Sequence, residues 1–277
     1  MKLGIVADEI DRDFRKAAAV GRALGIERYE VRNLTTGRIP LCDAAELAAV
    51  EQTGVEITAI SPGLFKYTET TAEFTCEMAE VYPRAAEWAH RWKLPGLIVF
   101  GFHKPGTTEG SPGVVGDPPA AVTEWLAQAG EQAAVDGLLL VIEPEPICWC
   151  DTARRTAALI ERSGAASLRI NYDPGNVAWL ENRDPLDEFE AAAPWIANVH
   201  VKDLRPLDRG SGHPEWAPAG EGMIDYRAHF AALKGISYRG PVSLEPHIDG
   251  RPETIRRCKM AVENLYASPL PCPRRRS

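Results

Sequence analysis

The sequence has no run of about 18 consecutive apolar residues, the shortest length typical of a membrane-spanning helix. It opens with a strand-like stretch, Leu3-Gly4-Ile5-Val6-Ala7, which is too short for the apolar region of a signal peptide. We therefore expect a cytoplasmic protein that has no membrane as a partner.

Cysteine is sparse for a chain of 277 residues, and only Cys148 and Cys150 lie close together. No second cysteine pair or nearby histidine completes a tetrahedral set around this Cys-X-Cys pair. We expect reduced thiols and no disulfide framework. The six cysteines are Cys42, Cys76, Cys148, Cys150, Cys258 and Cys272.

An excess of positive charge is also missing. Lysine and arginine number 31 against 39 acidic residues, which gives a net charge of −8. Binding to DNA or RNA depends mainly on basic side chains, so a nucleic-acid partner is not expected and a small molecule is favoured. We interpret residues 269–277, which include Arg274, Arg275 and Arg276, as a flexible tail after a domain at 1–268.

What is present is an alternation of short apolar runs with segments of helical period. Such strands, covered by helices, are typical of a parallel sheet. Eight repeats in a chain of this length predict a single (β/α)₈ TIM barrel. An open doubly wound sheet is the competing architecture, but no G-x-G-x-x-G follows the first strand. The predicted strands are Leu3–Ala7, Tyr29–Asn33, Glu56–Ser61, Gly96–Gly101, Leu138–Glu143, Leu168–Asp173, Ile196–Lys202 and Pro241–Pro246; the predicted helices are Asp13–Leu24, Ala44–Gln52, Thr71–Trp92, Ala120–Val135 and Thr152–Ser163.

Four successive strands towards the end of the chain finish with a side chain that can bind a metal: Glu143, Asp173, His200 and Glu245. In a barrel these strand ends meet at one face, where the long segments 104–119 and 204–222 would cover a substrate. Three carboxylates and one imidazole form a hard, oxygen-rich set, which favours Mn²⁺, Mg²⁺ or Co²⁺, while Zn²⁺ is also compatible. Singly, each acid could instead cap a helix or form a salt bridge.

With these motifs the chain resembles the xylose isomerase-like barrel superfamily, in its sugar phosphate isomerase/epimerase branch, over nearly its whole length. The resemblance implies that Glu143, Asp173, His200 and Glu245 bind one divalent metal, with Mn²⁺ our first choice. It also implies a homodimer or homotetramer. The motifs that carry it are Glu143-Pro-Glu-Pro, Asp173-Pro-Gly-Asn176, His200-Val-Lys-Asp203, Gly220-Glu-Gly-Met-Ile-Asp225 and Leu244-Glu245.

Several polar residues near the strand ends are candidates to bind hydroxyl, carboxylate or phosphate groups of a substrate. Many members of the superfamily have histidine where this chain has Asn176, and an amide can contact substrate but cannot exchange protons near neutral pH. Glu30 and Arg32 could bind substrate or pair with each other, and Trp149 and Trp216 could touch substrate or only pack. The candidates for substrate binding are Lys66, His103, Asn176, Lys202, Arg205, Glu221 and His213.

The function we expect is a sugar, keto-sugar or polyol isomerase or epimerase. A metal-stabilised enediolate would form by proton transfer, with Glu143 and Glu245 as the acid/base pair, in either order, on opposite faces of the reacting carbon, as in epimerases that resemble this chain. A dehydratase of an inositol-like or keto compound would use the same enolisation. A metal-dependent hydrolase of the apurinic-endonuclease type and a non-catalytic sugar-binding barrel are two further functions that such a barrel could have.

Overall fold

The computed structural model describes residues 1–108, 116–207 and 214–268. Each stretch of sequence predicted to be a strand forms one, and all pairings among them are parallel. His213 and the segment 269–277 lie outside the described residues. The eight strands are β1 (Lys2–Val6), β2 (Arg28–Val31), β3 (Glu56–Ile60), β4 (Gly96–Phe100), β5 (Leu139–Glu143), β6 (Leu168–Tyr172), β7 (Ile196–Val201) and β10 (Pro241–Leu244).

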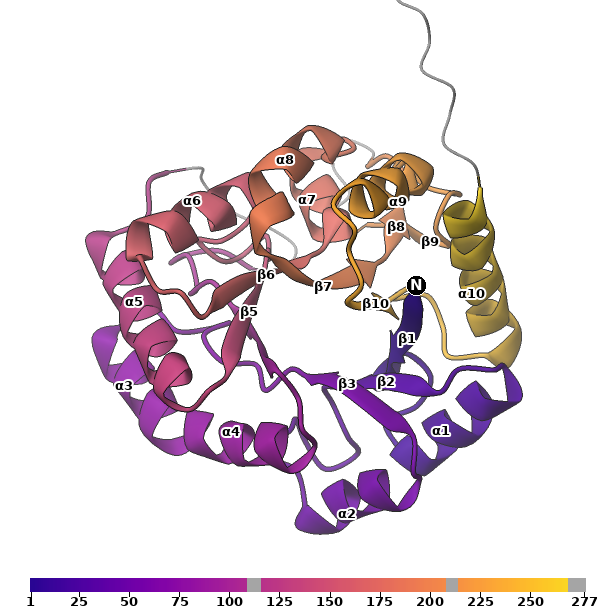
Figure 1. Cartoon of the computed structure of the whole chain (residues 1–277), viewed down its shortest axis with the longest axis horizontal. Helices are drawn as coiled ribbons and strands as arrows, with labels where there is room; N and C mark the ends of the chain where they lie inside the picture. The colour runs from indigo at the N-terminus through magenta and orange to yellow at the C-terminus, as the bar shows by residue number, and fades with distance from the viewer. Residues whose placement is uncertain (109–115, 208–213, 269–277) are drawn as a thin grey trace, which may run out of the picture.

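The strands curve into a barrel in the order β3-β2-β1-β10-β7-β6-β5-β4. Figure 1 looks down this barrel and shows the helices forming an outer ring. β3 and β4 stand at the two ends of this order and face each other without a ladder of paired residues in the described part of the chain. The predicted (β/α)₈ barrel is therefore confirmed, with one seam that is not fully hydrogen-bonded.

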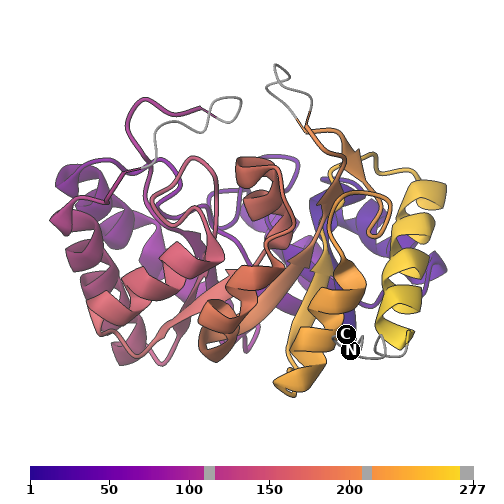
Figure 2. The same cartoon turned by 90° about the horizontal axis from the view of Figure 1, so that it is seen from above.

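The helices follow the strands and lie outside the sheet (Figure 2). Several begin at a side chain that caps their first turn, such as Asp13, Thr70 and Thr152. After β7, the two-residue strands β8 (Asp203–Leu204) and β9 (Trp216–Ala217) form a small antiparallel pair. The α-helices are α1 (Phe14–Ala23), α2 (Ala44–Gln52), α3 (Thr71–Glu80), α4 (Tyr82–Arg91), α5 (Ala120–Val135), α6 (Ala153–Ser163), α7 (Pro174–Glu181), α8 (Phe189–Ala192), α9 (Tyr226–Gly235) and α10 (Pro252–Ala267); the 3₁₀ turns are η1 (Ala7–Glu9), η2 (Leu186–Glu188) and η3 (Ala193–Trp195).

One predicted helix is divided in the structure. The stretch 71–92 forms α3 and α4, which meet at Val81. Pro83 lies at the start of α4 and has no backbone N–H to donate to the preceding turn, so a continuous helix would lose a hydrogen bond there. The prediction of a single helix was wrong because it gave the apolar period more weight than this proline.

The barrel interior changes character along its axis. A layer of small and aliphatic side chains from neighbouring strands, Ala59, Ile98 and Val141, packs together inside it. Two residues after Val141 on the same strand, and so on the same face of the sheet, stands Glu143. The apolar layer thus supports a polar cluster at the carboxyl ends of the strands, the face on which barrel enzymes carry their sites.

None of the described helices is both long enough and apolar enough to span a bilayer. The cysteines of the described residues are all free, and Cys148 and Cys150 are buried. Burial raises the pKa of the Cys150 thiol to about 12, so this thiol stays protonated at neutral pH.

Candidate metal and substrate site

The four side chains predicted to bind a metal come together at one end of the barrel. Glu143, Asp173, His200 and Glu245 each offer a ligand atom, and these atoms all lie within 4.8 Å of one another. All four side chains are buried. The residues occupy the end of β5, the position after β6, the body of β7 and the position after β10, so the parallel strands bring them to the same rim.

His200 has the geometry of a metal-binding imidazole. Its Nε2 lies 2.9 Å from Glu30 Oε2 on β2, and a carboxylate there accepts a hydrogen bond, so Nε2 carries the proton. Its Nδ1 is buried, makes no hydrogen bond with any described residue, and lies 3.0 Å from Glu245 Oε2 and 3.5 Å from Glu143 Oε2. Metal-bound histidines usually have their second nitrogen held by such a carboxylate, so the residues present fit a divalent ion.

Lys202 lies against the same carboxylates. Its Nζ is 2.7 Å from Glu245 Oε2 and 2.8 Å from Asp173 Oδ2, and the residue is buried. Lys202 directly follows β7, two residues after His200. The ammonium therefore compensates part of the negative charge that the cluster gathers.

Two amides hold Glu143 in place. Asn171 Nδ2 donates to Glu143 Oε2 over 3.1 Å, and Asn176 Nδ2 donates to Glu143 Oε1 over 3.1 Å. Asn176 is brought there by α7, whose first turn is capped by Asp173 accepting from the Asn176 N–H. A Cβ at position 175 would lie 2.3 Å from Lys202 Cγ, which is too close for any side chain. Only glycine therefore allows the first turn of α7 to pack against Lys202.

Arg32 clamps the opposite side of Glu245. Its guanidinium forms ion pairs with Asp8, Glu9 and Glu245. Glu30 instead pairs with His200, so the possibility that Glu30 and Arg32 pair with each other was wrong. Glu30 lies on β2 and Arg32 directly follows that strand, and their charged groups diverge because each finds an opposite charge on a different strand or turn.

When no metal is bound, the surroundings shift the pKa values of Glu143 and Glu245 in opposite directions. Burial, which outweighs the attraction of His200, raises the pKa of Glu143 to about 7. Burial acts in the same direction on Glu245, but Lys202, His200, His247 and Arg32 outweigh it and hold its pKa well below the ordinary value. Burial likewise opposes charge on His200, yet the carboxylates of Glu30, Glu245 and Glu143 raise its pKa well above the usual range.

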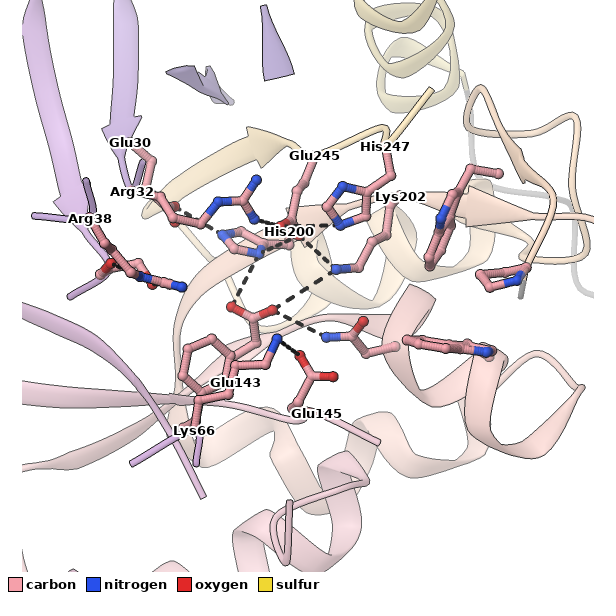
Figure 3. A pocket seen from close by; sticks show the side chains of 16 residues that line it. Glu30, Arg32, Arg38, Lys66, Glu143, Glu145, His200, Lys202, Glu245 and His247 are labelled. Carbon is pink, nitrogen blue, oxygen red and sulfur yellow. Dashed lines mark hydrogen bonds and ion pairs between the residues drawn. The ribbon is translucent and has the colours of Figure 1, made fainter. Parts of the chain in front are cut away.

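These side chains form one wall of a cavity of about 380 Å³, shown in Figure 3. This volume suits a small sugar. Trp179 and Trp216 line the cavity and meet edge to face with ring centroids 6.0 Å apart. The other lining residues are Glu30, Arg32, Arg38, Ser61, Lys66, Phe100, Glu143, Glu145, Asn176, Pro214, His200, Lys202, Glu245 and His247.

Not every predicted substrate contact reaches this cavity. Lys66, Asn176 and Lys202 line it, and Lys66 forms an ion pair with Glu145 over 3.2 Å. The structure does not bring three others to it: His103 Nδ1 lies 2.7 Å from Glu69, Arg205 is exposed beside Glu215, and Glu221 pairs with Arg257 on α10.

Arg38 and Trp179 line the cavity but were not predicted from the sequence. Arg38 lies in the segment between β2 and α2. Segments that follow strands build the active face of a barrel, so a basic residue there was a usable signal. Trp179 lies on α7 and carried no comparable signal.

The chain matches a family model over most of its length and a curated protein over less than half of it. A family model described as the xylose isomerase-like TIM barrel matches residues 14–263. The putative L-ribulose-5-phosphate 3-epimerase SgbU of Escherichia coli (strain K12) is 29% identical over 123 residues, which cover 44% of this chain and 43% of that protein. The match therefore spans less than half of the length of this curated relative.

Solved structures agree with the fold. The IolI protein with a bound zinc atom has a TM-score of 0.73 at 16% identity, and the match covers 96% of this chain and 98% of that one. The probable 3-DHS dehydratase AsbF of Bacillus anthracis has a TM-score of 0.69 at 19% identity, with the same coverage of 96% and 98%. At these identities the likeness establishes the architecture alone.

Proposed function

We propose, from the premise that this chain belongs to the xylose isomerase-like TIM barrel family, that it is a divalent-metal-dependent sugar epimerase or isomerase. The substrate would be a keto-sugar or a related polyol. The observation that carries the proposal is the convergence of Glu143, Asp173, His200 and Glu245, whose ligand atoms all lie within 4.8 Å of one another beside a sugar-sized cavity.

The donor set supports a catalytic rather than a structural metal. Three carboxylates and one neutral imidazole suit Mn²⁺, and also Mg²⁺, Co²⁺ or Zn²⁺. An ion held by these residues would supply Lewis acidity to a carbonyl and an adjacent hydroxyl, which lowers the cost of removing the neighbouring C–H proton. The cavity beside the cluster leaves room for a substrate to complete the coordination.

Glu143 and Glu245 would move the proton. They come from β5 and from the end of β10, strands that are separated by β6 and β7 in the sheet order, so they can approach one carbon from two sides. One carboxylate accepts the proton from carbon, and the other, as a carboxylic acid, returns a proton to the opposite face. The raised pKa of Glu143 applies to the metal-free site, and a bound cation would favour its carboxylate form, the state that accepts a proton.

The remaining side chains would position the substrate and the two glutamates. Asn171 and Asn176 fix both oxygens of Glu143. Lys202 and Arg32 hold Glu245 from two directions. Trp216, with Lys202 Nζ 5.8 Å from its ring centroid, would cover one side of the sugar and exclude water from the reacting carbon.

Metal content and proton exchange test this proposal in sequence. Elemental analysis of the purified protein should find a stoichiometric divalent ion that is lost in His200→Ala. Incubation in deuterium oxide with ketoses and inositol derivatives should then place deuterium on one carbon of a substrate. Glu143→Gln and Glu245→Gln should each reduce this exchange by at least ~10²-fold. Glu51→Gln, a change of a surface carboxylate paired with Arg91 outside the cluster, is the matched control.

The same experiment separates the competing functions. Exchange followed by loss of water from the substrate would assign a dehydratase, which shares the enolisation step. Cleavage of abasic DNA without exchange into any sugar would assign a hydrolase. Absence of metal under every loading condition would leave the non-catalytic sugar-binding barrel. Wild-type exchange rates in either glutamine variant would eliminate the two-carboxylate mechanism.

A further inference from the structure

Arg38 lines the cavity, and contacts with neighbouring residues fix the orientation of its guanidinium group. Its Nε donates to Ser61 O over 2.8 Å and its Nη2 donates to Ser61 Oγ over 2.7 Å. The guanidinium carbon also lies 5.7 Å from the centroid of Phe100. These contacts occupy one edge and one face of the guanidinium, and leave Nη1 without a hydrogen bond among the described residues.

The segment after β3 is built around this side chain. Gly63 has a φ of +85°, and a Cβ on it would lie 2.9 Å from Arg38 Nε. Any other residue at this position would strain the backbone and press on the guanidinium. Ser61 and Gly63 therefore form a cradle that fixes Arg38 against the cavity.

Arg38 differs from the other cations of the cavity in having no carboxylate within ion-pair distance in the described part of the chain. Arg32 is paired with Asp8, Glu9 and Glu245, Lys202 with Asp173 and Glu245, and Lys66 with Glu145. Burial and the neighbouring charge of Arg32 lower the pKa of Arg38, and the attraction of Glu143, Asp8 and Glu245 does not offset them. Arg38 is thus a half-buried charge without an ion-pair partner among the described residues. Such a charge is costly unless a ligand compensates it.

Its position sets it apart from the metal cluster. In Figure 3, Arg38 lies on the opposite side of Glu143 from Lys202 and His247. A sugar that presents its reacting carbon to Glu143 and Glu245 would direct one of its ends towards Arg38. We propose that Arg38 binds an anionic end group of the substrate, a carboxylate or a phosphate monoester, so that the substrate is a sugar acid or a sugar phosphate.

This inference rests on the proposed function for the orientation of the sugar, but its test requires neither metal nor turnover. Three compounds share one ketose skeleton and differ at the end remote from the carbonyl: D-fructose is neutral, D-fructuronate ends in a carboxylate, and D-fructose 6-phosphate ends in a phosphate. Calorimetric titration of the chelator-treated full chain with each compound measures the contribution of the end group.

The wild type should bind at least one anionic compound ~10- to 100-fold more tightly than fructose, the contribution expected of a charge-assisted hydrogen-bonded pair. Arg38→Gln should remove this preference and have a much smaller effect on the affinity for fructose than on that for the anionic compounds. Arg38→Lys keeps the charge but not the planar fork and should retain part of it. Arg91→Gln, which removes an exposed arginine on α4, should behave as wild type.

The two anionic compounds distinguish the source of the charge. A preference for fructuronate alone assigns a carboxylate subsite, and a preference for fructose 6-phosphate alone assigns a phosphate subsite. The same preference in Arg38→Gln as in the wild type, or no preference in the wild type, overturns the inference. Loss of the preference in Arg38→Gln upholds the subsite even if no metal or exchange is found, so the two proposals fail separately.

Discussion

His200 Nε2 lies 2.9 Å from Glu30 Oε2, a contact that joins β7 to β2 across the barrel. The two residues are far apart in the sequence, and both are buried. The carboxylate fixes which imidazole nitrogen carries the proton and turns Nδ1 towards Glu143, Asp173 and Glu245. Glu30 would therefore act through His200 on a metal held by the four predicted ligands, without being one of them.

Glu30→Gln should weaken metal binding while leaving the barrel folded. The amide can still accept the hydrogen bond, but it lacks the charge that makes the imidazole a better donor to a metal. We expect a loss of ~10- to 100-fold in metal affinity, measured by competition with a chromophoric chelator. Glu56→Gln changes a surface carboxylate on β3 and is the control. Equal affinities in the wild type and Glu30→Gln would show that the contact is only structural.

Metal affinity should rise with pH. The surrounding carboxylates, against the effect of burial, raise the pKa of His200 well above its usual value, so the metal-free imidazole keeps its second proton to a higher pH than a free histidine does. A metal must displace that proton, and each proton released gives up to a tenfold gain in apparent affinity per pH unit. Chelator competition at three pH values between about 6 and 8 measures the slope. A slope of zero would contradict this prediction.

Glu143→Gln should change how the stability of the metal-free protein depends on pH. Burial raises the pKa of Glu143 to about 7, above the value near 4.3 of an unfolded glutamate. Between these values the folded chain binds more protons than the unfolded chain, so stability falls as the pH rises through this window.

The Glu143→Gln variant has no carboxyl group at this position, so it does not lose stability in this way as the pH rises. From about pH 5 to pH 8, its free energy of unfolding should therefore improve relative to the wild type by about 1 to 3 kcal/mol. Chemical denaturation of both proteins with chelator present provides the measurement. A constant difference between the two proteins over this range would mean that the Glu143 carboxyl does not titrate there.

Asp203→Asn should loosen the segment that follows β9. The Asp203 carboxylate accepts the backbone N–H groups of Leu204, Gly220, Gly222 and Ile224. Each carboxylate oxygen accepts two of these groups, so an amide that replaces one oxygen by a donor leaves two N–H groups without their acceptor, at a cost of about 1 to 3 kcal/mol.

The midpoint of urea denaturation should fall accordingly in Asp203→Asn, whereas Glu215→Gln, an exposed change one residue before β9, should leave it unchanged. An unchanged midpoint in Asp203→Asn would show that the oxygen contacts contribute little to the fold.

The order of apolar and helical segments in the sequence was enough to determine the barrel architecture. Eight apolar runs separated by helical segments allow few arrangements, because parallel strands need crossovers and helices must cover the sheet. It also determined the four converging residues, since the carboxyl ends of barrel strands meet at one face wherever the chain places them. The point at which α3 ends and α4 begins was also encoded, in Pro83, but the apolar period concealed it.

Only the tertiary structure decided which partners these side chains take. The pairing of Glu30 with His200 and of Arg32 with Glu245 depends on which strands become neighbours and how far each side chain reaches. Arg38 forms no ion pair with a described carboxylate because of the path of two loops, and the sequence carries no periodic signal for a loop path. Local pattern fixes the elements, whereas the balance of charge in the cavity arises from contacts between residues distant in the sequence.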